Sequence, residues 1–180
     1  MSTAATETQV WQLDPAHSQI GFRVKHMMVS TVRGNFRDFS VRLSYDPANV
    51  EAAGVEVELQ AASIDTGVEA RDDHLRSADF FDAEKYPVLR FVSRKVEQVG
   101  DGEVRVTGDL TIRDITREVV IEGEVAGPQK DPWGNMKLGV SGATKINRKD
   151  FELTWNQVLE SGGVLVADDI KIELELQFSK

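Results

Sequence analysis

The histidines are the residues of this chain that most readily suggest catalysis or metal binding. His17 and Ser18 are adjacent, and Asp14 precedes the histidine by one turn, which resembles the composition of a hydrolase triad. Adjacent residues of a strand point to opposite faces, so this histidine and serine are poorly placed to act as base and nucleophile. The chain has no G-x-S-x-G, H-E-x-x-H or H-x-x-E-H pattern. We therefore expect no enzyme activity, no catalytic residues, no metal site and no cofactor.

The two other histidines offer weaker signals. His26 shares the parity of Val24 and comes near the end of the first predicted strand. It either forms a polar cap by hydrogen bonding or contacts the head group of a ligand, and both roles stay open. His74 lies between Asp73 and Leu75, where we expect a surface or structural role.

Two arginines could bind an anionic group. Arg71 and Arg76 carry guanidinium groups, which match phosphate oxygens in a bidentate geometry. Alternatively, Arg76 pairs with Asp72 or another acidic neighbour and anchors a helix.

The elements that would position these groups are mostly strands. The C-terminal run alternates Ile170, Ile172, Leu174, Leu176 and Phe178 with polar residues, which is typical of a strand with one buried face. Similar alternation predicts eight strands in all, within residues 20–24, 39–45, 55–59, 88–93, 104–112, 119–125, 136–146 and 170–178, with the N-terminal strand counted as one element.

Short connections such as Gly100-Asp101-Gly102 predict an antiparallel meander. Closing such a meander into a barrel removes exposed strand edges. The outward positions carry many charges, for example Lys171, Glu173 and Glu175, at a density that a lipid-facing barrel does not tolerate. We therefore expect an all-β fold: a soluble, eight-stranded antiparallel barrel.

Residues 67–86 interrupt the alternation and predict an inserted helical segment. Thr66 and Glu69 have the spacing of a capping box, and Tyr86-Pro87 would end the helix. A short helix is marginal alone, so it must dock on the barrel. We expect it at a barrel mouth, with Phe80 and Phe81 facing inward, where it would control access to the interior.

Glycines at inward positions bear on whether the barrel is hollow. Gly108, Gly123 and Gly142 share the parity of the apolar residues. An eight-stranded barrel is just wide enough to be filled by side chains or to hold one small ligand. The glycines either leave a cavity or mark bends and bulges.

Composition limits the classes of partner. The chain has 180 residues, a formal net charge of −9 and no cysteine, so we expect no nucleic-acid partner, no disulfide and no thiolate site. It has no run of eighteen apolar residues and no signal-like N-terminus, so we expect no membrane-spanning segment and a cytoplasmic location. We expect a flexible tail over residues 1–9 and one barrel domain over residues 10–180.

Four segments resemble the YceI-like family of lipocalin-like, polyisoprenoid-binding proteins. They are WQLDPAHS followed by IGF and KH, RDDHLRSADFFD followed by YP, GDLTI, and RKDF. The resemblance spans nearly the whole chain after about residue 10, and HLRSADFFD with the following YP is its most specific part. It implies a lipocalin-like barrel around a long apolar channel, an isoprenoid-type ligand and a possible homodimer.

We therefore expect the barrel to bind a long-chain amphiphile, such as an isoprenoid or isoprenoid quinone, for carriage, storage or sensing. Two alternatives stay open: an enzyme acting on a lipid-like substrate at the mouth through His26, and a solidly packed interaction or stress protein without a ligand. The predicted ligand-binding residues are Phe22, Val24, His26, Phe39, Val41, Val57, Leu59, Arg76, Phe80, Phe81, Phe91, Leu110, Ile121, Val140, Ile172 and Leu174.

Overall fold

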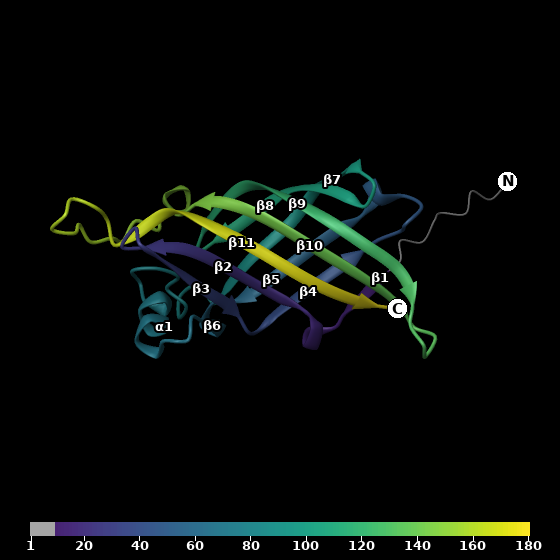
Figure 1. Ribbon diagram of the computed structural model, residues 1–180, viewed down its shortest axis with the longest axis horizontal. Coiled ribbons are helices and arrows are strands. Elements are labelled where there is room, and N and C mark those ends of the chain that lie inside the picture. The colour runs from purple at the N-terminus through teal and green to yellow at the C-terminus, as the bar shows by residue number, and fades with distance from the viewer. Residues whose placement is uncertain (1–9) are drawn as a thin grey trace.

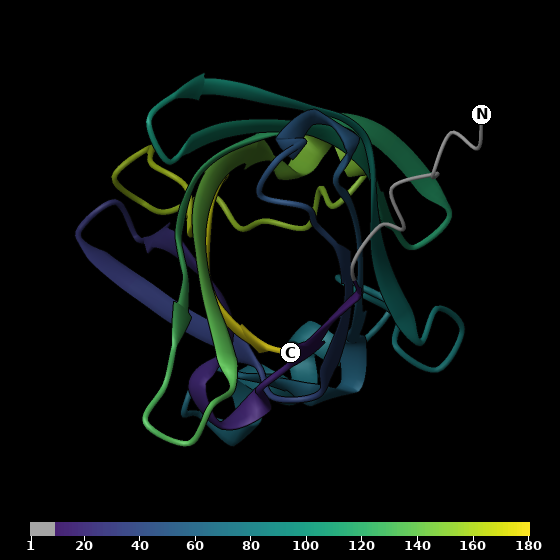
Figure 2. The ribbon, with the colours of Figure 1, turned by 90° about the vertical axis from the view of Figure 1, so that its right-hand side faces the viewer.

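The strands close into a barrel. A computed structural model describes residues 10–180 (Figure 1); the predicted tail over residues 1–9 lies outside the described residues. The sheet has the strand order β1-β4-β5-β7-β8-β9-β10-β11-β2-β3-β6, and β1 also pairs with β11. That last pairing closes a ring of eight antiparallel strands, which are β1, β4, β5, β7, β8, β9, β10 and β11. Figure 2 shows this ring along its axis. The predicted eight-stranded antiparallel barrel is confirmed.

The strand bounds follow from the pairing. They are β1 (Val10–Leu13), β2 (Gln19–His26), β3 (Ser30–Phe36), β4 (Phe39–Ser44), β5 (Gly54–Gln60), β6 (Ile64–Asp65), β7 (Val88–Gly100), β8 (Glu103–Ile112), β9 (Ile115–Lys130), β10 (Met136–Asn147) and β11 (Val166–Ser179).

The N-terminal part differs from the prediction of one strand. A 3-10 turn, η1 (Pro15–His17), separates β1 from β2, and Asp14 Oδ1 accepts a hydrogen bond from the Ala16 amide in it. Both strands pair with β11, so together they act as one interrupted strand of the ring. β3 was not predicted, because Gly34 stands in its inward series between Val32 and Phe36 and hides the alternation.

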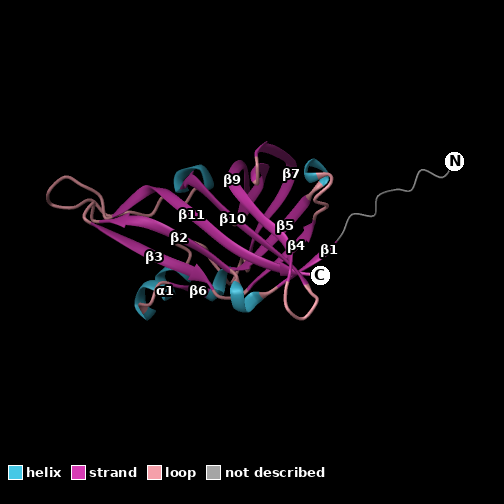
Figure 3. Ribbon diagram, turned by 45° about the vertical axis from the view of Figure 1, so that its right-hand side comes forward, coloured by secondary structure: helices cyan, strands magenta, loops and turns pink. Residues whose placement is uncertain are grey.

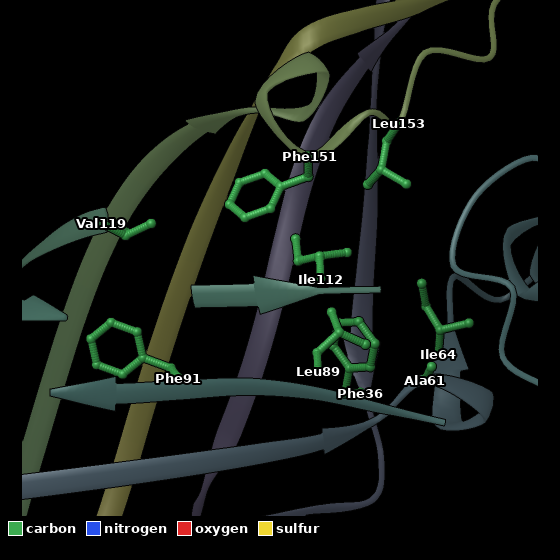
Figure 4. Packing of buried hydrophobic residues seen from close by; sticks show 9 residues of the cluster. All are labelled: Phe36, Ala61, Ile64, Leu89, Phe91, Ile112, Val119, Phe151 and Leu153. Atoms are coloured by element: carbon green, nitrogen blue, oxygen red, sulfur yellow. The ribbon is translucent and has the colours of Figure 1, made fainter. Parts of the chain in front are cut away.

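Two apolar clusters fill the barrel. The first contains Phe36, Ala61, Ile64, Leu89, Phe91, Ile112, Val119, Phe151 and Leu153 (Figure 4). The second contains Trp11, Ile20, Val41, Leu43, Tyr45, Leu138, Leu176 and Phe178. The first lies toward the end that carries the helix, and the second lies toward the end with β1 and the C-terminus.

The inserted segment is less helical than predicted. Its α-helix, α1, covers Glu69–Arg76, and turns and bends occupy residues 77–87 (Figure 3). The predicted capping box is wrong: Val68 is the N-cap residue and supplies no side-chain cap. Thr66 instead donates from its backbone N and its Oγ1 to Asp72 Oδ1, at 2.9 and 2.6 Å. Asp72 is buried, so these bonds hold the first turn of the helix against β6.

Three further 3-10 turns connect the strands: η2 (Val50–Ala52), η3 (Ala61–Ser63) and η4 (Arg148–Phe151). Within residues 10–180, no helix is both long and apolar enough to cross a membrane.

A buried arginine holds the segment that follows β10. Arg148 is 2% exposed, and its guanidinium donates to the carbonyl oxygens of four residues, Leu153, Trp155, Val166 and Ala167, at 2.6 to 3.3 Å. Burial lowers the pKa of Arg148, although guanidinium remains charged in proteins. The arginine therefore ties the loop over residues 152–165 to the start of β11.

Candidate functional site

An apolar cavity of about 90 Å³ lies inside the barrel, between β4, β5 and β7 to β11. Its lining is almost wholly apolar and comes from the inward residues of these strands and from the β4–β5 connection. The lining residues are Leu43, Tyr45, Val50, Ala53, Gly54, Val55, Val57, Phe91, Val96, Val104, Val106, Ile121, Gly123, Val125, Val140, Ser141, Gly142, Leu174, Leu176 and Phe178.

Two glycines line the cavity wall in different ways. Gly123 and Gly142 are cross-strand partners and lie between Val104 and Leu174 in the register. A Cβ atom on Gly142 would come within 2.9 Å of Ile121 Cγ2 and 3.4 Å of Leu174 Cδ1. Both of these side chains line the cavity, so the missing side chain at Gly142 adds to its volume. A Cβ atom on Gly123 would lie 2.7 Å from the Ser141 carbonyl oxygen, so Gly123 serves the close approach of neighbouring strands.

The third inward glycine does not add to the cavity. A Cβ atom on Gly108 would lie 2.5 Å from both Phe91 Cζ and the Val92 carbonyl oxygen. The Phe91 ring therefore occupies the space above this glycine, and Gly108 serves close packing.

Tyr45 is a polar group in the cavity lining that the sequence prediction missed. The residue is 8% exposed, and its carbonyl oxygen accepts a hydrogen bond of 3.1 Å from Trp11 Nε1. Burial raises the pKa of the Tyr45 hydroxyl, so it is a neutral hydrogen-bonding group at ordinary pH. Its position in the alternating run with Val41 and Leu43 could have identified it as inward-facing.

Only some of the predicted ligand-binding residues line the cavity. Those that do are Val57, Phe91, Ile121, Val140 and Leu174. Others pack against the apolar clusters without lining the cavity: Phe22, Phe39, Val41, Leu59, Phe81 and Leu110. Val24 and Ile172 lie on the same inward face of β2 and β11 and are half-buried.

The inserted segment lies away from the cavity, because the first apolar cluster separates them. Phe81 packs edge-on against Phe36 at a centroid distance of 6.0 Å, and no residue of α1 lines the cavity. The expectation that this segment controls access to the barrel interior stays a prediction. Tyr45, Val50 and Ala53 line the cavity from the end of β4 and the β4–β5 connection.

Phe80 and Arg76 have structural contacts instead of inward ones. The Phe80 ring lies against His74 and Trp155, at centroid distances of 5.1 and 5.4 Å. Arg76 donates to the Ala62 carbonyl oxygen at 2.9 Å and to Asp73 Oδ1 at 2.8 Å. The inward prediction for Phe80 is wrong, and Arg76 anchors the helix through Asp73 and not through Asp72.

The remaining histidines show no catalytic geometry. His17 Nδ1 lies 2.8 Å from Asp14 Oδ2, and this hydrogen bond lowers the pKa of Asp14. Ser18 Oγ donates to the Asp14 carbonyl oxygen at 2.7 Å, away from the imidazole. His26 ends β2 on the inward face but does not line the cavity. In the described part of the chain, no group of three or more His, Cys, Asp or Glu could hold a metal ion.

A larger hollow of about 850 Å³ lies on the outer surface and is open to solvent. Charged side chains of β2, β3, β8, β9 and β11 line it. Arg23 and Glu173 of the lining form an ion pair, and Glu122 of the lining pairs with Arg105 outside it. Its charged lining is unsuited to an apolar chain, so the internal cavity is the better candidate for the predicted ligand.

Comparisons with known proteins agree with the fold. A family model described as a YceI-like domain matches residues 11–178. A UPF0312 protein of Vibrio cholerae is 43% identical over 136 residues, which are 76% of this chain and 72% of the relative. The crystal structure of BcnA from Burkholderia cenocepacia has a TM-score of 0.82 at 27% identity and covers 92% of this chain and 99% of that chain.

A more distant structure has the same fold. It is a polyisoprenoid-binding domain from Saccharophagus degradans, with a TM-score of 0.66 at 14% identity, covering 96% of this chain and 98% of that chain.

Proposed function

The chain belongs to the YceI-like family, and from this premise we propose that it binds the apolar chain of an isoprenoid-type amphiphile inside its barrel, without catalysing a reaction. The observation that carries the proposal is the apolar lining of the cavity inside the barrel. The printed description of the Saccharophagus degradans domain as polyisoprenoid-binding supports the same ligand class.

Burial supplies the binding free energy in this proposal. Removing a methylene group from water contributes about 0.8 kcal/mol, so one isoprene unit contributes on the order of 4 kcal/mol before the costs of association. The lining requires no directional chemistry along the chain. The Tyr45 hydroxyl is a candidate partner for a polar group of the ligand, because Tyr45 belongs to a lining that is otherwise almost wholly apolar.

The cavity must widen to take a long chain. Its volume of about 90 Å³ is smaller than the roughly 300–1,000 Å³ of typical ligand sites. Several lining side chains are only half-buried, among them Val57, Ile121 and Leu174. We propose that rotation of such side chains, next to Gly142, enlarges the channel when ligand enters.

The test is direct. The purified full chain is extracted with organic solvent, and the extract is analysed by mass spectrometry. In parallel, a fluorescent apolar probe is added, and its displacement by prenol or prenyl quinone is measured. We expect a co-purifying lipid or saturable displacement; an empty extract together with no probe binding would overturn the proposal.

The role of the bound lipid belongs to the proposal as well: carriage, storage or sensing all use the same cavity. The homodimer and the cytoplasmic location stay predictions.

A further inference from the structure

Exposed apolar side chains gather at the end of the barrel where β2 turns into β3. Val29, Val158 and Met28 are 80%, 76% and 70% exposed, and Met27 and Val164 are also exposed. Together these five residues form what we term the apolar tip. Figure 1 shows the loop before β11 projecting on the left, with the β2–β3 turn at its base. Grouped exposed apolar residues of this kind mark interaction sites.

Contacts between the two segments make the tip one surface. The Met27 amide donates to the Leu165 carbonyl oxygen at 2.8 Å. Met28 Sδ lies 2.8 Å from the ideal Cβ position of Gly163, in the other segment. Within the loop before β11, Val158 and Val164 face each other in a β-bridge.

The base of the tip is held in place. Asn156 receives a hydrogen bond from the Val166 amide at 3.0 Å and donates one to the Val166 carbonyl oxygen at 2.8 Å. Arg148 binds the carbonyl oxygens of Leu153 and Trp155 just before it. Because both ends of the loop are fixed, the valines stay exposed and do not fold back onto the barrel.

The β2–β3 turn places bulky residues where glycine or asparagine is favoured. Met27 and Met28 have φ angles of 53° and 61°, in the left-handed region. Such strain in an exposed turn tends to occur at functional sites. Methionine is also flexible and polarisable, and it adapts to irregular apolar surroundings.

The apolar tip and the residues next to it in the chain carry almost no charge. Residues 26–31 and 153–167 contain Glu160 as their only formally charged residue, whereas 28% of the whole chain is charged. Since the chain carries a net charge of −9, the nearly uncharged tip is a part of the surface that can approach a lipid bilayer with little desolvation and repulsion.

We propose that the apolar tip docks on the surface of a zwitterionic lipid bilayer, with its methionines and valines in the interfacial region. The tip is a projection and has few residues, so it lacks the roughly 20–30 residues that a stable protein interface uses on each side. A bilayer accepts an apolar projection of any shape, and binding there scales with the buried apolar area. This inference goes beyond ligand binding, because docking needs neither the cavity nor a bound lipid.

The experiment uses the full chain and phosphatidylcholine vesicles in a co-sedimentation assay. The wild type is compared with the double variant Val29→Asp/Val158→Asp. Both positions are exposed, so the fold should be kept, and thermal unfolding checks this. A matched control, Val120→Asp, places the same charge on the outer face of β9, where Val120 is 39% exposed. We expect the double variant to lose at least about tenfold in vesicle binding, a difference of about 1.4 kcal/mol, and the control to bind as the wild type does.

Three results would overturn the proposal: a wild type that stays in the supernatant, a double variant that binds as well as the wild type, or a control that loses as much as the double variant. Sedimentation velocity without vesicles adds a fourth. If the wild type is a dimer, the double variant is a monomer and neither binds vesicles, the tip is a surface for self-association and the docking proposal fails.

Solvent extraction of the same preparations separates this proposal from the previous one. Lipid retained by a double variant that no longer sediments supports docking through the tip. A wild type that contains lipid but ignores vesicles overturns the docking proposal and leaves ligand binding standing.

Discussion

The two halves of the barrel interior are packed in different ways. Toward α1, large rings meet directly: Phe22, Phe36 and Phe81 form a series with centroid distances of 6.1 and 6.0 Å. Toward the β4–β5 connection, valines and paired glycines face one another and leave a cavity.

This difference separates stability from binding within one barrel. Rings that interdigitate at crystal-like density resist any change in volume. A wall of valines and glycines forgoes some packing energy and keeps space for a ligand. The packed half should therefore carry the greater part of the fold's stability, and the cavity half should carry its binding.

The largest expected effect is a loss of stability from a substitution in the packed half. Phe151 is 1% exposed in the first cluster, and Phe151→Ala should lower the free energy of unfolding by about 3–5 kcal/mol, because it leaves a void among fixed neighbours. Val140→Ala, in the cavity wall, removes less apolar surface next to existing space and should cost about 1–2 kcal/mol. Urea denaturation measures both, and equal losses would contradict the comparison.

The same substitution in both halves gives a smaller effect. Gly108→Ala puts a methyl group 2.5 Å from the Phe91 ring and from a backbone oxygen, and overpacking of this kind should cost about 1–3 kcal/mol. Gly142→Ala puts a methyl group 2.9 Å from Ile121 Cγ2 and 3.4 Å from both Leu174 Cδ1 and the Glu122 carbonyl oxygen. These distances are longer than at Gly108, so we expect less than half of that cost. Thermal unfolding of the two variants measures which one loses more stability. A greater loss of stability in Gly142→Ala would contradict the comparison.

Filling the cavity should reduce ligand binding while leaving the stability of the fold nearly unchanged. Val57→Phe adds a ring to the cavity wall, and it should reduce apolar-probe binding by at least about tenfold, or about 1.4 kcal/mol. Its effect on stability should stay within about 1.5 kcal/mol, because the ring enters existing space. Val120→Phe, on the outer face, is the control. Unchanged probe binding in Val57→Phe would mean that the ligand lies elsewhere.

The smallest expected effect is on the pH dependence of stability, through Asp65 at the packed end of the barrel. Asp65 Oδ1 accepts a hydrogen bond from the Gly67 amide at 2.8 Å, and this bond, with the Arg37 ion pair, lowers the pKa of Asp65. Because the folded pKa lies below the unfolded value, the carboxylate stabilises the fold above about pH 4, and its contribution is lost as the pH falls through the folded value.

Asp65→Asn should therefore flatten the acid limb of the stability profile slightly. Urea midpoints of the wild type and the variant, measured at several pH values below about 5, test this. Parallel profiles would show that Asp65 makes no pH-dependent contribution.

Much of the fold could be predicted from alternation alone. The C-terminal run from Ile170 to Phe178 is one strand with its apolar face inward, and the short turn at Gly100–Gly102 joins antiparallel neighbours, as expected. These features depend on local period and turn chemistry, which a sequence carries directly.

The cavity could be predicted only in part. Parity placed Gly108 and Gly142 on the same face, but the Phe91 ring fills the space over one and not the other. Parity likewise could not show that Phe80 turns toward Trp155, since the two residues meet only through the loop that Arg148 holds. Such outcomes depend on contacts between distant segments and on side-chain volumes.

The seam between β1 and β11 has a consequence for how the chain folds. Leu13 pairs with Phe178, and Ser18 Oγ accepts a hydrogen bond from the Gln177 amide, 159 residues away in sequence. The ring can therefore close only after the last strand has left the ribosome, so every earlier species has an open sheet with unpaired edges. Such high contact order predicts slow folding, and it makes the nascent chain, more than the finished barrel, the form that is vulnerable to aggregation.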